Sequence, residues 1–146
     1  MPEGVSEFRW WWIKTTKPKE EKIFLYYPNS ARTDCKVIRV CDRDGLDHAI
    51  LIWNACHDCR FGMIAKISII DEWQRQGLGR RLLLWALRES PGCDWVTSGQ
   101  SPEAQLFFPA MARETGAAFT TNRGKSCGHL DIGNRSYPRP RVLTDI

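Results

Sequence analysis

Hydrophobic positions in the first half of the chain recur with the spacing of β-strands. Short apolar or alternating runs are separated by turn-prone residues, as is typical of strands in one sheet. We therefore predict strands over Phe8–Lys14, Ile23–Tyr27, Lys36–Val40, Ala49–Trp53 and Phe61–Ile70. The first of these is rich in aromatic residues, and no helical pattern is evident before Arg80.

The spacing of apolar residues becomes helical in the second half. Leucines at helical spacing predict a helix over Gly79–Leu87, and a short strand follows at Asp94–Thr97. Ser101 has the character of an N-cap, and the helix that it opens should run to about residue 114, with Gly116 closing it. Two further expectations are a last strand near 117–121 and an extended surface tail over 134–146.

This order of elements predicts an α+β, or mixed α/β, domain built around one sheet. The length of 146 residues is most simply one domain, over 1–146. Hydrophobic residues make up 42% and charged residues 26% of the chain, which is ordinary globular composition rather than that of a disordered chain.

Charge and hydropathy exclude some classes of function. The net charge of +4 suits a small polyanionic ligand but is too small to predict nucleic-acid binding. No apolar run approaches the roughly 20 residues needed to span a bilayer, so we expect no membrane association. The first residues lack a basic region followed by a long apolar core, which leads us to expect a cytoplasmic protein with free thiols at its six cysteines.

The glycine-containing turn Gln74–Gly79 lies between the apolar run that ends at Ile70 and the predicted helix. A glycine has no Cβ, so a ligand can approach its backbone closely. The first N–H groups of a helix lack internal partners and carry partial positive charge. The pattern therefore predicts a site for an anion such as a diphosphate, with Arg75, Arg80 and Arg81 adding positive charge.

This turn resembles the acyl-coenzyme A signature of the GNAT acetyltransferase superfamily. That signature is an apolar strand, an acidic turn and then Q/R-x-x-G-x-G/A, and its three fixed positions match Gln74, Gly77 and Gly79. Downstream, Ser101-Pro102-Glu103-Ala104 and Phe107-Phe108 resemble the Asn-Pro-x-Ala and Phe-Tyr stretch of the family. The resemblance covers residues 61–119.

The resemblance implies a GNAT-like, mostly antiparallel central sheet flanked by helices, here with a strand-rich N-terminal half and reduced early helices. It also implies an N-acyltransferase that uses an acyl-coenzyme A, most simply acetyl-coenzyme A. The acceptor would be a primary amine on a small molecule or a protein. The cofactor contacts implied are Ile67, Ser68, Ile69, Gln74, Arg75, Gln76, Gly77, Leu78, Gly79, Arg80, Ser101, Phe107 and Phe108.

The chain departs from the family pattern in its chemistry. Many members use a tyrosine to protonate the leaving thiolate, but Phe108 stands at that position and has no proton to give. Ser98, Ser101, Cys93 or water are the alternatives, and the catalytic residues stay unassigned. A non-catalytic module that binds acyl-coenzyme A is therefore the second hypothesis. The candidate bases are the acidic and histidine side chains Asp47, His48, Asp58, Asp71 and Glu72.

Two further motifs have simpler interpretations. Cys56 and Cys59 have the spacing of a zinc knuckle that Cys127 and His129 could complete, but without a second C-x-x-C we predict a hairpin turn and no metal. The run Trp10–Trp12 is expected to place Trp10 and Trp12 on one face of a strand and Trp11 on the other, with at least one face in the core rather than serving as a binding platform. An exposed Trp11 would then indicate a dimer or acceptor contact.

Overall fold

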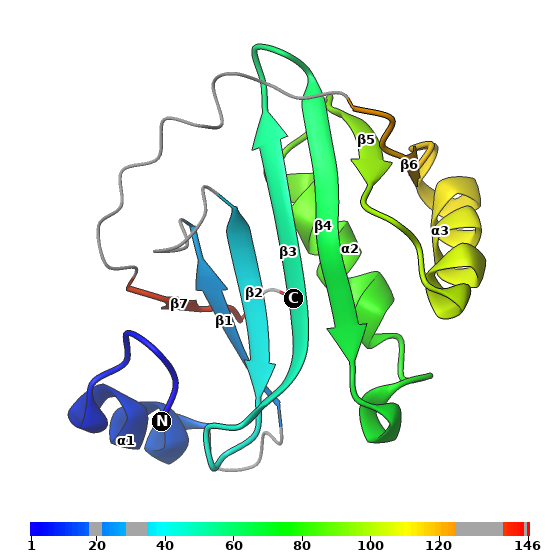
Figure 1. Cartoon of the computed structure of the whole chain (residues 1–146). Coiled ribbons are helices and arrows are strands. Elements are labelled where there is room, and N and C mark those ends of the chain that lie inside the picture. The colour runs from blue at the N-terminus through cyan, green and yellow to red at the C-terminus, as the bar shows by residue number, and fades with distance from the viewer. Residues whose placement is uncertain (18–21, 29–34, 125–138, 145) are drawn as a thin grey trace.

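The computed structural model describes residues 1–17, 22–28, 35–124, 139–144 and 146. They form one seven-stranded sheet with three α-helices (Figure 1). The strands are β1 (Ile23–Tyr27), β2 (Lys36–Cys41), β3 (Asp47–Cys56), β4 (Phe61–Ile69), β5 (Asp94–Thr97), β6 (Thr120–Thr121) and β7 (Arg141–Val142). The helices are α1 (Glu7–Thr16), α2 (Leu78–Glu89) and α3 (Pro102–Thr115), with a short 3₁₀ turn, η1 (Asp71–Trp73), before α2.

The sheet has the order β6-β5-β4-β3-β2-β1-β7. Strands β1 to β4 pair in antiparallel fashion with their neighbours, β7 is antiparallel to β1, and β5 is parallel to both β4 and β6. The crossover from β4 to β5 runs through α2, because parallel strands need a long connection. The expectation of a mixed α/β fold with a mostly antiparallel sheet is confirmed.

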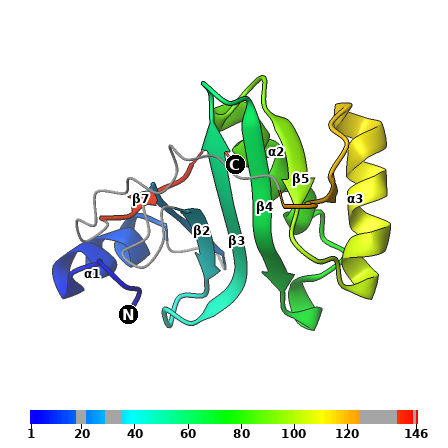
Figure 2. The same cartoon turned by 45° about the horizontal axis from the view of Figure 1, so that its top comes forward.

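The helices cover opposite faces of the sheet because side chains alternate along each strand. Phe24 and Tyr26 of β1 point into the cluster that contains Leu82 and Trp85 of α2. The intervening Leu25 joins the cluster of Trp10 from α1 on the other face. Helix α3 lies beside β5 and β6 and adds its buried side chains to the α2 cluster (Figure 2).

The prediction of a strand over Phe8–Lys14 is wrong, because this segment belongs to α1. Ser6 caps the helix by accepting a hydrogen bond from the N–H of Arg9 at 3.2 Å. The helical period buries Trp10 and leaves Trp11 and Trp12 each 55% exposed, so Trp10 and Trp12 do not share the core face. The aromatic residues favoured a strand, but Ser6 caps a helix that buries Trp10 and Ile13 at helical spacing.

Residues 139–144 of the predicted tail are extended but paired with the sheet rather than fully solvated, whereas 134–138 lie outside the described residues. Arg141 and Val142 form β7, which pairs with Tyr26 and Leu25 of β1. The N–H of Leu143 also donates to the carbonyl of Phe24 at 2.9 Å. With Leu143 only 4% exposed, this segment is part of the core rather than a solvated terminus.

A buried thiol and a buried phenol make the stability of the fold depend on pH in the alkaline range. Burial raises the pKa of the Cys41 thiol from 9.0 to about 12 and that of the Tyr27 phenol from 10.0 to about 12. Their protons are held in the folded state, so the stability they contribute is complete below the unfolded pKa values and is lost as pH rises toward the folded ones. We expect the free energy of unfolding in urea to decline above about pH 9.

The matched variant for this prediction is Tyr27→Phe, which removes the phenol proton. In the wild type the Tyr27 hydroxyl donates to the carbonyl of Glu3 at 2.6 Å, so the variant should be less stable at neutral pH. The decline of its unfolding free energy with pH should be shallower than that of the wild type. Equal slopes for the two proteins would show that Tyr27 does not take part.

Candidate functional site

Strands β4 and β5 are paired over only part of their length. Their parallel register runs from Phe61 opposite Asp94 to Ile64 opposite Thr97. Ser98 marks the end of the pairing, because its N–H donates to the carbonyl of Ile64 at 2.9 Å and its Oγ donates to the carbonyl of Ala65 at 2.6 Å. We call this point, where β4 and β5 part, the vertex. Beyond it β4 continues to Ile69, while the chain after β5 leads to α3.

A β-bulge in β4 lies at the same vertex. Trp53 of β3 is opposite Ile64 and Ile52 is opposite Lys66, so Ala65 is an extra residue. After the bulge, the N–H of Ile70 donates to the carbonyl of His48 on the β3 side at 2.9 Å. Because main-chain groups alternate in direction along a strand, those of Ile67 and Ile69 point to the opposite edge, away from β3.

The turn after β4 leads directly into the N-terminus of α2. The side chain of Gln74 donates to the carbonyl of Ile69 at 2.8 Å, which ties the turn to the end of the strand. Arg75 and Gly77 both have positive φ angles, of 62° and 73°, and α2 begins at Leu78. Main-chain N–H groups in such turns and at helix N-termini form concave sites with partial positive charge.

The two glycines of the turn have different roles. A Cβ on Gly77 would have no neighbour within 4 Å, so this residue leaves open space and permits the positive φ. A Cβ on Gly79 would lie 3.3 Å from side-chain atoms of Ile69 and Phe107. Gly79 therefore allows α2 to pack closely against β4 and α3, a role different from the ligand approach expected from the sequence.

The open edge of β4, the turn and α3 enclose a cleft of about 660 Å³. This volume lies in the range of small-molecule sites, roughly 300–1,000 Å³. The structure brings together at this cleft most of the residues expected to contact the cofactor. They are Ile67, Ser68, Ile69, Gln74, Arg75, Gly77, Leu78, Gly79, Arg80, Ser101 and Phe107.

Two of the expected contact residues do not line the cleft. Phe108 is 3% exposed and packs in the core against Phe119, with ring centroids 5.5 Å apart. The Gln76 side chain donates to the carbonyl of Glu72 at 3.1 Å. The resemblance aligned Phe107 and Phe108 with one family stretch, but α3 directs them to different surroundings, one partly exposed at the cleft and the other buried.

Helix α3 supplies cleft residues that the sequence reasoning missed. Ala110, Met111 and Glu114 line the cleft together with Phe107, and Trp73 closes the other side. Positions 107, 110, 111 and 114 follow the i, i+3, i+4, i+7 spacing of one helix face. That period, counted from Phe107, was the signal that could have identified them.

The charged groups at the cleft come from both helices. Arg80 Nε donates to Glu114 Oε1 at 2.6 Å, and this hydrogen bond raises the pKa of Arg80 and lowers that of Glu114 from their ordinary values. Arg81 points elsewhere, donating to the carbonyl of Ile146 at 2.9 Å and stacking on Phe24. Of Arg80 and Arg81, it is Arg80 that lines the cleft.

The acidic and histidine side chains considered as bases do not line the cleft. Asp47 pairs with Arg39 at 2.6 Å, and Asp71 accepts a hydrogen bond from Gln74 at 3.3 Å. His48 Nε2 lies 2.5 Å from Asp42 Oδ2, and its ring packs edge-on against Trp73. Glu72 and Asp58 are exposed and do not line the cleft.

The hydroxyls and the thiol considered as acids also have assigned partners. Ser101 caps α3, its Oγ accepting from the N–H of Ala104 at 3.2 Å. The Cys93 thiol lies 3.8 Å from the carbonyl of Cys56, at the start of β5, and burial raises its pKa. Ser98 stands at the vertex itself, and its Oγ proton is donated to Ala65.

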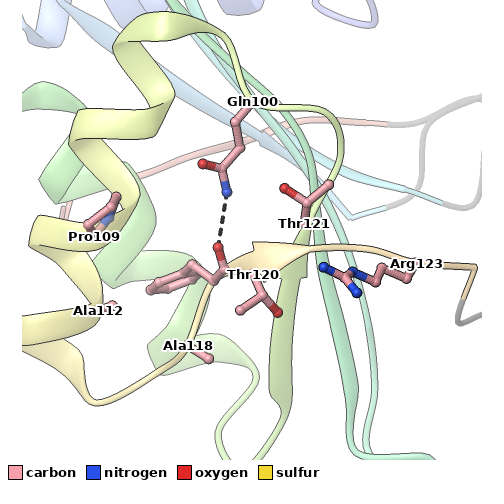
Figure 3. A pocket seen from close by; sticks show the side chains of 8 residues that line it. Gln100, Pro109, Ala112, Ala118, Thr120, Thr121 and Arg123 are labelled. Carbon is pink, nitrogen blue, oxygen red and sulfur yellow. Dashed lines mark hydrogen bonds between the residues drawn. The ribbon is translucent and has the colours of Figure 1, made fainter.

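A second hollow of about 550 Å³ lies between α3 and β6 (Figure 3). Gln100 spans it, its side-chain nitrogen donating to the carbonyl of Phe119 at 3.0 Å and to Thr97 Oγ1 at 2.9 Å. Pro109 and Ala112 face it from α3, and Arg123 lies at its rim (Figure 3). The amide of Gln100 thereby fastens the end of β5 to the segment before β6.

Within the described residues, no group of three or more histidine, cysteine or acidic side chains could hold a metal ion. Cys56 is buried at the end of β3, and Cys59 is exposed in the hairpin turn between β3 and β4. Cys127 and His129 lie outside the described residues. Among the helices that the structure describes, none is long and apolar enough to cross a membrane.

The comparisons with known proteins found similarity at the level of structure alone. No protein-family model matches the chain, and no curated protein sequence matches it. A solved structure that is similar is an aminoglycoside N-acetyltransferase, AAC(6')-Iy, in complex with coenzyme A. The likeness has a TM-score of 0.40 at 15% identity and covers 64% of this chain and 66% of that protein.

Proposed function

We propose that the protein binds an acyl-coenzyme A in the cleft beside β4 and transfers the acyl group, most simply acetyl, to a primary amine. The observation that carries this proposal is the separation of β4 from β5 beside a turn that favours anions. Main-chain groups of Ile67 and Ile69 face the same cleft as the N-terminus of α2. The sequence resemblance to the acyl-coenzyme A signature covers this same turn.

The residues present fit the parts of such a ligand. The N–H groups from Arg75 to Arg80 would hold the diphosphate, since that of Gln74 donates to the carbonyl of Asp71. The edge of β4 at Ile67 and Ile69 would pair with the amides of the pantetheine arm, and Phe107 would pack against its apolar portion. When bound, acyl-coenzyme A supplies an activated thioester, which an amine can attack directly in a ternary complex.

The vertex of the two strands is where we place the reacting end of the ligand. A main-chain N–H of β4 near Ala65 would stabilise negative charge on the thioester oxygen. Ser98 holds the bulge in place through Ala65, so its part is to position this backbone. Ser98 donates its hydroxyl proton to Ala65 and the Cys93 thiol lies beside Cys56, which leaves water or the Ser101 hydroxyl, whose oxygen only accepts from Ala104, as the proton carrier.

A second candidate function is a module that binds acyl-coenzyme A without catalysis. The burial of Phe108 favours it, because the family position for a proton donor is occupied here by a core side chain without a hydroxyl. The cleft would then serve as a sensor of coenzyme A or as a contact site for a partner. The two candidates share the binding site and differ only in turnover.

Calorimetric titration with coenzyme A and acetyl-coenzyme A, followed by thiol release with a panel of primary amines, tests the proposal. Binding with amine-dependent thiol release supports the enzyme, and binding without release supports the second candidate. Absence of binding to either compound contradicts both. Adenosine triphosphate is the control ligand, since it has phosphates and adenine but no pantetheine arm to pair with β4.

A further inference from the structure

One ion pair joins the two helices that border the cleft. Arg80 lies in the first turn of α2 and Glu114 in the last turn of α3, and both line the cleft. Arg80 Nε donates to Glu114 Oε1 at 2.6 Å, and Arg80 Nη2 pairs with the same oxygen. One carboxylate oxygen thus takes two donors of the guanidinium.

The pair lies where the proposed function places the diphosphate. Arg80 follows Gly77 by three residues and belongs to the turn whose N–H groups would receive the phosphates. Glu114 brings a negative charge to this end of the cleft. An anion bound at the N-terminus of α2 and the Glu114 carboxylate therefore need the same guanidinium and repel each other.

The pair can be exchanged because it is accessible to solvent. The side chain of Arg80 is 55% exposed and that of Glu114 is 38% exposed. Exposed ion pairs contribute little to stability. A diphosphate carries more charge than a carboxylate and also gains the helix N–H groups, so it should take the guanidinium from Glu114.

We infer that Glu114 is an affinity-determining residue that competes with the diphosphate of the ligand for Arg80. The inference rests on the proposed function. The ligand-free protein keeps the cleft bridged by Arg80 and Glu114, and binding exchanges this bridge for a phosphate contact. Glu114 thereby lowers the affinity for the ligand and makes its binding depend on Arg80.

Glu114→Gln removes the competing charge and keeps the size of the side chain. We expect the dissociation constant of coenzyme A, measured by calorimetry at low ionic strength, to fall about two- to fivefold. Glu103→Gln is the matched control. Glu103 also lines the cleft as an exposed side chain, but Arg80 makes its ion pair with Glu114, so this variant should change the constant less.

Arg80→Gln supplies the second arm of the test. It should weaken binding, and adding Glu114→Gln to it should restore almost nothing, because the competition needs the guanidinium. Unchanged or weaker binding by Glu114→Gln, with binding intact in the wild type, would overturn the inference and leave the proposed function standing. If neither the wild type nor Glu114→Gln binds coenzyme A, both are contradicted.

Discussion

Gly77→Asp should raise the dissociation constant for coenzyme A by about a hundredfold or more. The residue is the N-cap of α2, and a Cβ there would point into open space. Aspartate would place a carboxylate where the diphosphate is expected, so like charges would meet and the space would be filled. Calorimetric titration at fixed ionic strength measures the change.

The folded state should survive this substitution. Aspartate at a helix N-terminus interacts favourably with the helix, which offsets part of the cost of a φ of 73° for a residue with a Cβ. Gly92→Asp is the matched control, since Gly92 has a φ of 79° and open space but lies in the turn after α2. Coenzyme A affinity retained by Gly77→Asp would contradict the position of the site.

Trp85→Ala should lower the free energy of unfolding by about 3–5 kcal/mol. Trp85 is 1% exposed on the inner face of α2. The centroid of its ring lies 4.7 Å from that of Tyr26 and 6.1 Å from that of Trp53, so one side chain joins α2 to β1 and β3. Its removal leaves a large cavity at the centre of the main cluster.

The control is a tryptophan-to-alanine substitution at an exposed position. Trp12 is 55% exposed on α1, so Trp12→Ala should change the free energy of unfolding by no more than about 0.5 kcal/mol. Urea denaturation followed by circular dichroism compares the two, and Trp85→Phe serves as an intermediate if Trp85→Ala does not fold. Similar losses for Trp85 and Trp12 would contradict the described core.

The elements defined by local signals could be predicted from the sequence. Helix α2 has leucines at helical spacing and a glycine before it, and α3 has Ser101 as its cap and Gly116 at its end. The turn that we predict to bind an anion lies within one short segment, so the residues expected there come together without any long-range information. The cleft could be predicted to this extent because strand, turn and helix are consecutive.

Features that depend on distant contacts were missed. Nothing local marks Arg141 and Val142 as partners of β1, because their pairing is decided by residues more than a hundred positions away. The different surroundings of Phe107 and Phe108 depend on the rotation of α3 about its axis. Helix α1 is a different kind of miss, because Ser6 was a visible capping signal beside aromatic residues that favour strands.

Beyond Ala65 the pairing of β4 with β5 has ended, so the sheet has an unpaired main-chain margin in its interior as well as its two outer margins. Exposed main-chain margins attract strands of other molecules and lead to aggregation. Here the margin beyond Ala65 borders the cleft, which α3 also lines, and the contact between Arg80 and Glu114 joins α2 to α3 at the same cleft. A margin that is covered in this way is less available for pairing with another copy of the chain than an outer margin is.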